Sequence, residues 1–144
     1  MNVLKYCVIF SVAVTFTFSF CWLIAEEAKP KPVSFVKDIK PIFEKRCVHC
    51  HNRETLPDRV SFEKAEFAFS KDKFGKVYIV PGKPDQSLLN KAIESPDFHE
   101  MMMPMVGLRT TKSETEMIRR WVLEGAKWPK GILGNVKVTF RVKE

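Results

Sequence analysis

The chain has 144 residues and a formal net charge of +7, with 45% hydrophobic and 28% charged residues. This length favours a single domain plus a targeting segment. This balance of apolar and charged residues excludes a disordered chain, and no pattern typical of a nucleic-acid-binding module accompanies the basic charge.

The first 25 residues show the pattern of an export signal. Lys5 is their only charged residue, and the run from Tyr6 to Ala25 is uncharged. A signal peptide combines a short positive start with an apolar stretch, and about 20 apolar residues can also span a bilayer. We predict that residues 1–25 are a signal peptide or a membrane anchor, and that residues 26–33 are a spacer. The protein is then periplasmic or extracytoplasmic, and it meets the membrane only through an uncleaved N-terminal segment.

The part of the chain beyond residue 25 keeps the basic excess. Removing the leader takes away one lysine, which leaves 23 basic and 17 acidic residues and a net charge of +6. Such a surface can steer association with acidic partners, and the simpler interpretation is a solvated, lysine-rich face.

A first helix is predicted to begin at Asp38 and to end near Cys50. Asp38 is a suitable N-cap. Pro41 would then lie in the first turn, where a backbone N–H has no partner within the helix, so the N–H that proline lacks is not needed. Apolar residues then recur at helical spacing up to Cys47.

The central part of the chain is less regular. Residues 62–69 could form a short helix, Val77–Val80 is a short apolar run, and Asp85 can cap a helix over Gln86–Glu94. A methionine-rich loop over residues 95–110 follows.

The last predicted helix covers Lys112–Glu124. Thr111 and Glu114 match a capping box, and Gly125 is a natural C-terminal stop. Beyond it, residues 135–144 alternate between apolar and polar side chains, so they predict a short C-terminal strand that could pair with Val77–Val80 or lie against a partner. Residues 34–134 are thus the predicted domain, and residues 135–144 form a strand-like tail.

Cys47-Val48-His49-Cys50-His51 matches the Cys-x-x-Cys-His haem-attachment pattern. Two thiols one helical turn apart can add to the two vinyl groups of one porphyrin, and the following histidine can then reach the iron as proximal ligand. A disulfide or a redox pair is the competing interpretation, but no βαβ pattern flanks the motif. We predict one covalent haem c on Cys47 and Cys50, iron ligation by His51, and an outward-facing His49.

A sixth iron ligand must come from elsewhere in the chain. Candidate thioethers lie about 50 residues beyond the motif, at Met101, Met102, Met103 and Met105, and His99 is the alternative that would give a bis-His iron. Methionines also fill irregular gaps in apolar cores, so any one of them could be structural.

Several segments in order resemble the planctomycete-type cytochrome c domain of the class I cytochrome c superfamily. The resemblance extends from about Ser34 to Trp128 and rests on these stretches: Asp38–Ile42, Cys47–His51, Val80–Leu89, Met103-Pro104 and Arg120–Ala126. It implies a mainly α-helical haem domain in which the methionine before proline is the distal ligand, and this residue is Met103. The family usually reads Met-Pro-Pro, whereas this chain has Met103-Pro104-Met105.

These observations predict a monohaem c-type cytochrome that transfers single electrons between redox partner proteins and is not an enzyme. A haem-bearing sensor or a structural subunit of a larger complex is the alternative function. A peroxidase-like enzyme would need an open iron position with acid–base residues beside it. His99 and Glu100 are candidates for that role, and the methionine cluster argues against it.

Overall fold

The computed structural model describes residues 30–107 and 109–138. Its contacts divide the chain into two units, Met1–Lys31 and Pro32–Glu144, and the second is the domain described here. The predicted signal or anchor segment, residues 1–25, lies outside the described residues. Among the residues that are described, no helix is both long enough and apolar enough to cross a membrane.

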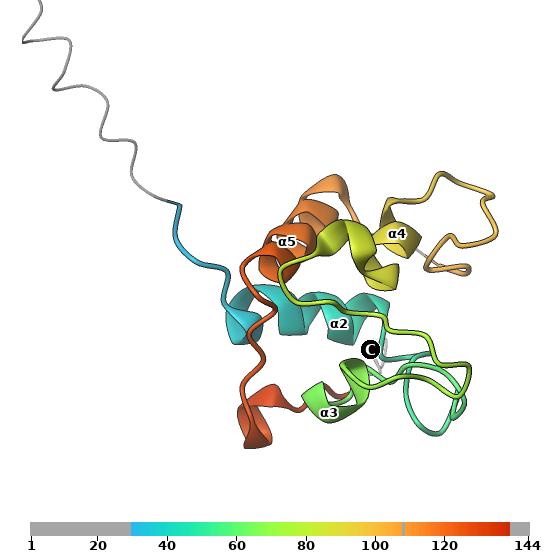
Figure 1. Ribbon diagram of the computed structural model, residues 1–144, viewed down its shortest axis with the longest axis horizontal. Helices are drawn as coiled ribbons and strands as arrows, with labels where there is room; N and C mark the ends of the chain where they lie inside the picture. The colour runs from blue at the N-terminus through green and yellow to red at the C-terminus, as the bar shows by residue number, and fades with distance from the viewer. Residues whose placement is uncertain (1–29, 108, 139–144) are drawn as a thin grey trace, which may run out of the picture. The chain divides into compact units, whose positions relative to one another are not determined.

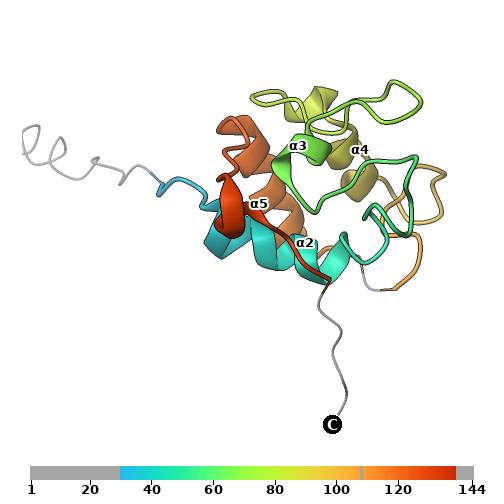
Figure 2. The same cartoon turned by 90° about the horizontal axis from the view of Figure 1, so that it is seen from below.

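The domain is mainly helical, as the sequence predicts (Figure 1). Its elements in chain order are a π-helical turn η2 (Phe35–Ile39), α2 (Lys40–Arg46), α3 (Ala65–Ala68), a 3-10 turn η3 (Pro84–Gln86), α4 (Leu88–Glu94), α5 (Lys112–Leu123) and a 3-10 turn η4 (Gly131–Gly134). α5 packs against η2 at one side and against α4 at the other, and α2 continues directly from η2. The long connections on either side of α3 and after α4 supply most of the loops (Figure 2).

The first helix begins earlier than predicted. Ser34, rather than Asp38, is the N-cap: its hydroxyl accepts a hydrogen bond from the Lys37 amide, and Asp38 Oδ2 accepts one from the Ser34 amide at 2.7 Å. The Lys40 amide bonds to the Phe35 carbonyl five residues back, which makes this turn π-helical. The wider turn lies just before Pro41, whose ring would clash with a carbonyl four residues back in a regular helix.

The last helix matches its prediction closely. Thr111 Oγ1 accepts from the Glu114 amide and the Glu114 carboxylate accepts from the Thr111 amide, so the capping box is complete. α5 ends before Gly125, which has a φ of +97°. Because an L side chain is strained at that angle, glycine suits this helix end.

The cap predicted for α4 is wrong. Ser87 occupies the N-cap position, and its hydroxyl accepts from the Val80 amide at 2.9 Å. Asp85 instead forms an ion pair with Arg119 of α5. The proline at position 84 starts a separate 3-10 turn, which places Asp85 inside that turn and away from the helix end.

The core is built from aromatic rings held between η2, α2, α5 and the C-terminal loop. Trp121 and Phe43 are completely buried, and Phe35 stacks on Trp128 with ring centroids 4.2 Å apart. Phe62 contacts Phe43 at a centroid distance of 5.0 Å. Burial of such large side chains supplies much of the stability of a small domain.

The predicted C-terminal strand is not supported. Residues 135–138 have no strand pairing, and residues 139–144 lie outside the described part of the chain. Val136 is buried, and its amide bonds to the Glu63 carbonyl at 2.9 Å. The expected partner segment is used elsewhere, because Val77 bridges to Lys71 and Tyr78 accepts from the Leu89 amide. Over the described residues 135–138, the apolar positions Val136 and Val138 pack against the core and not in a sheet.

An ion pair joins the end of α2 to the start of α5. Arg46 Nη2 lies 3.1 Å from Glu114 Oε2, and both side chains are largely buried. Burial by itself would raise the pKa of Glu114, but the Thr111 amide and the Arg46 guanidinium outweigh it and lower the pKa. The carboxylate therefore stabilises the fold above the usual glutamate pKa, and this contribution is lost as the pH falls through the lowered value.

Glu114→Gln should destabilise the protein by about 1–3 kcal/mol at neutral pH, because Arg46 loses its charged partner in a largely dry position. Thermal unfolding measured across pH should show the difference from wild type shrinking as the pH falls through the lowered pKa of Glu114, where the native carboxylate becomes protonated. Asp58→Asn is the control: Asp58 pairs with Lys73 on an exposed surface, and its loss should cost less than about 1 kcal/mol. Equal effects of the two substitutions would contradict this assignment.

Candidate functional site

The Cys-x-x-Cys-His segment follows the C-terminus of α2. Cys47 is the C-cap of that helix, and its carbonyl accepts from the amides of both Cys50 and His51. The helix was predicted to reach Cys50, but it ends at Arg46 and continues as a tight turn. Cys47 is buried, whereas His49 and Cys50 are exposed, which confirms the predicted orientation of His49.

Both cysteines carry free thiols in this structure. They are not joined as the disulfide that was the alternative interpretation of the motif. Burial raises the pKa of the Cys47 thiol to about 12, with a smaller opposing contribution from Arg46. Cys47 is therefore uncharged at neutral pH, and it is the less accessible of the two thiols to reagents in solution.

His51 is half-buried beside Phe62 and Val60. The rings of His51 and Phe62 approach edge to face at 5.5 Å, and the Phe62 amide bonds to the His51 carbonyl at 2.9 Å. Burial lowers the pKa of His51, although the Val60 backbone partly opposes this. The imidazole is therefore neutral at physiological pH, which is the form that binds metals.

The residues present fit a covalent haem. His51 Nδ1 is buried and has no hydrogen-bond partner among the described residues, which is unusual for a buried polar atom. Two free thiols precede it at the spacing that haem attachment requires. Cys47 and Cys50 would hold the haem, and His51 would ligate its iron.

Asn52 locks the turn that carries His51, and the sequence analysis did not single it out. It is buried, and its amide nitrogen donates to the carbonyls of Val48 and His49 and to the Thr55 hydroxyl. Its carbonyl accepts from the amides of Glu54 and Thr55 at 2.9 and 2.8 Å. An asparagine followed three residues later by threonine could have indicated such an Asx-type turn.

Asn52→Ala should destabilise the domain by about 3 kcal/mol, because it leaves several buried backbone groups without partners. Chemical unfolding of the purified protein measures this effect. Asn52→Asp is the informative companion, since it keeps the acceptor for Glu54 and Thr55 but loses the donor to Val48 and His49. We expect an intermediate loss of stability for it, and full stability of the alanine variant would show that the turn is held by other contacts.

The methionine-rich loop leaves α4 and lies at the same end of the domain as the Cys47–His51 segment in both views (Figures 1 and 2). Met103 is half-buried, and its amide bonds to the Ala92 carbonyl of α4 at 3.0 Å. Met102 is also half-buried, and its sulfur accepts a hydrogen bond from the Phe98 amide. Met101 and Met105 are exposed, at 36% and 68%. The assignment of one of them as distal ligand stays a prediction.

His99, the alternative distal ligand, is exposed. Its Nδ1 accepts a hydrogen bond from the Met101 amide at 3.1 Å, so this nitrogen is used within the loop. Glu100 beside it is exposed as well. The loop thus buries thioethers in preference to the imidazole.

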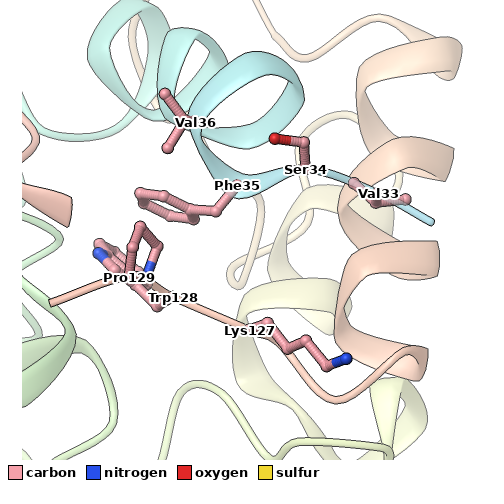
Figure 3. Close-up of a pocket in the computed structure, with 7 residues that line it drawn as sticks. All are labelled: Val33, Ser34, Phe35, Val36, Lys127, Trp128 and Pro129. Carbon is pink, nitrogen blue, oxygen red and sulfur yellow. The ribbon is translucent and has the colours of Figure 1, made fainter. Parts of the chain in front are cut away.

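One open cavity lies away from this site. It measures about 370 Å³ and is lined by Val33–Val36 and by Lys127–Pro129 (Figure 3). None of the motif residues and none of the methionines lines it. A cavity of this kind does not identify the functional site, and the chemistry of the donor residues carries more weight.

Comparison with known families identifies part of the chain. The family of planctomycete cytochrome C matches residues 47–105, which span the Cys-x-x-Cys-His motif and the methionine cluster. The match supports a planctomycete-type cytochrome c domain over this part of the chain. Searches among curated proteins and among solved structures each found no significant match. Cytochrome c domains carry covalently bound haem c and serve electron transfer, and the mainly helical fold is compatible with this.

Proposed function

We propose that the protein is an extracytoplasmic monohaem c-type cytochrome that passes single electrons between redox partners. The observation that carries the proposal is the Cys47–His51 turn within the matched region, where two free thiols precede a half-buried, neutral imidazole. A single such motif occurs in the sequence, which supports one haem per chain.

The bound haem would supply a one-electron couple, and the protein would set its potential. Cys47 and Cys50 would fix the porphyrin, and His51 would hold the iron from one side. A methionine on the other side, for which we propose Met103, would raise the potential relative to a bis-His iron. Phe62 and Val60 pack around His51 and lower the polarity of its surroundings, which also affects the potential.

Three measurements on native holoprotein test the electron-carrier function. The haem content per chain should be one, and a redox titration should follow a single one-electron transition. Carbon monoxide should bind the ferrous protein poorly, because both axial positions are filled. Ready binding of carbon monoxide would instead favour the sensor or peroxidase-like alternatives, which need an open iron position.

The basic surface supports acidic redox partners. We propose that exchange with such a partner is steered electrostatically, given the net charge of +6 beyond the leader. The second-order rate of electron exchange with an acidic partner should then fall as ionic strength rises. A rate that does not depend on salt would remove the support for steering.

Export is proposed from the uncharged run Tyr6–Ala25. N-terminal sequencing of the native protein distinguishes the two possible outcomes. A new N-terminus near residue 26 indicates cleavage, and an intact Met1 in the membrane fraction indicates an anchor. Holoprotein found in the cytoplasm would contradict both.

A further inference from the structure

A turn of the domain exposes large apolar side chains at the end remote from the candidate haem site. In η4, Ile132 is 85% exposed and Leu133 is 62% exposed, and Val36 of the neighbouring η2 is 38% exposed. η4 contacts η2, and both lie at the same end of the domain in Figures 1 and 2. Cys47 lies at the other end of the helix that η2 begins.

The exposed turn is held in a fixed position. The Trp128 indole N–H donates to the Gly134 carbonyl at 2.7 Å, and the same indole stacks on Phe35. A Cβ built on Gly134 would lie 1.8 Å from the Pro129 carbonyl oxygen, so the two backbone segments touch here. Ile132 and Leu133 are thus presented to the surroundings by a tightly packed support. Packing of this kind restricts the turn, so the exposure does not arise from a loose loop.

The open groove of Figure 3 borders this face, and Val33 and Phe35 in its lining are largely buried. The ring of Phe35 lies against Trp128 and Pro129, while the Lys127 side chain extends away from them (Figure 3). Pro129, the last residue of the groove lining, lies two residues before the start of η4 in the sequence. The apolar turn and the groove lining together form what we call the η4 face, consisting of Val33–Val36, Lys127–Pro129, Ile132 and Leu133.

The charges around the η4 face are mainly positive. The segment from Gly125 to Lys143 contains no acidic residue, and Lys127, Lys130 and Lys137 in it are exposed. Three carboxylates border this face: Asp38 and Glu124 accept hydrogen bonds from the backbone amides of Ser34 and Val33, and Glu44 accepts one from the Lys137 amide at 3.5 Å. Exposed apolar residues surrounded by lysines are typical of segments that enter the interface of an anionic membrane.

The chain enters the domain through this same face. Val33, which lines the groove, lies only eight residues beyond the uncharged run that ends at Ala25. If that run remains in a membrane, the spacer can carry Val33 at most roughly 28 Å away from it. The membrane surface would then be a nearby partner that offers both an apolar layer and charged lipid head groups.

We propose that the η4 face binds an anionic lipid membrane, with Ile132 and Leu133 in the interfacial layer and the surrounding lysines on lipid phosphates. The candidate haem site, at the other end of the η2–α2 helix, would then be directed away from the bilayer and open to soluble partners. Each lysine near an anionic surface should strengthen binding about fivefold, and the two apolar side chains should add to it.

Photocrosslinking of the full chain tests this proposal whether or not the leader is cleaved. A benzoylphenylalanine is introduced in place of Ile132 in one protein and in place of Val106 in another. Val106 is a matched control because it is 88% exposed and belongs to the methionine-rich loop. Each protein is mixed with radiolabelled vesicles of phosphatidylglycerol or of phosphatidylcholine and irradiated.

We expect at least several-fold more lipid adduct from position 132 than from position 106 on phosphatidylglycerol vesicles. Phosphatidylcholine, high salt, or the double substitution Lys130→Glu and Lys137→Glu should reduce that adduct about tenfold or more. Equal adduct at the two positions would overturn the proposal. So would crosslinking of position 132 to an added acidic protein in place of lipid.

Discussion

Replacing both Cys47 and Cys50 by serine should abolish covalent haem attachment. Cys47 and Cys50 are free thiols in the matched domain, and no other cysteine follows residue 50. The wild-type protein should keep its haem through denaturing electrophoresis and acid–acetone extraction, and its mass should exceed the polypeptide by one haem. The double variant should show neither property.

The single variants refine this expectation. One thioether bond should still hold some haem covalently in Cys47→Ser or in Cys50→Ser, with lower yield in both. His49→Ala is the control, because His49 lies between the cysteines but is exposed and makes no predicted contact with iron. Covalent haem in the double variant, or its loss in the His49 variant, would contradict the assignment.

The attachment motif could be predicted from sequence because its chemistry is local. Two thiols and an imidazole within five residues can attach one haem and ligate its iron without any long-range contact. The capping box of α5 was predictable for the same reason, since Thr111 and Glu114 are neighbours on one helical turn. Such features depend on short separations along the chain.

Features that depend on tertiary contacts were not predictable in this way. The start of the first helix was missed because a π-helical turn links Ser34 to Asp38, and no common sequence signal marks such a turn. A strand was predicted for the tail because apolar residues at alternate positions, such as Val136 and Val138, can pack against a core without pairing in a sheet. Asn52 was missed because its importance lies in the buried carbonyls that it satisfies, and these are visible only in the fold.

Met103→Ala should have the largest effect on the iron of any change in the methionine-rich loop. We expect loss of the absorbance band of ferric methionine–iron coordination and a fall in reduction potential on the order of 100 mV, within the roughly 0.8 V that axial ligands span. The position of Met103 supports this: it is half-buried and tied to α4 through the Ala92 carbonyl, which fixes where its side chain begins.

The other thioethers of the loop provide matched controls. Met101→Ala and Met105→Ala remove exposed side chains, and neither should change the band or the potential. Met102→Ala is the more demanding comparison, because Met102 is half-buried as well. Its sulfur accepts a hydrogen bond from the Phe98 amide and therefore helps to hold the loop in its conformation. It should lower stability slightly while leaving the iron spectrum intact. If His99→Ala alone altered the coordination spectrum, the iron would be bis-His, and the hydrogen bond between His99 Nδ1 and the Met101 amide would have to be a feature of the haem-free chain.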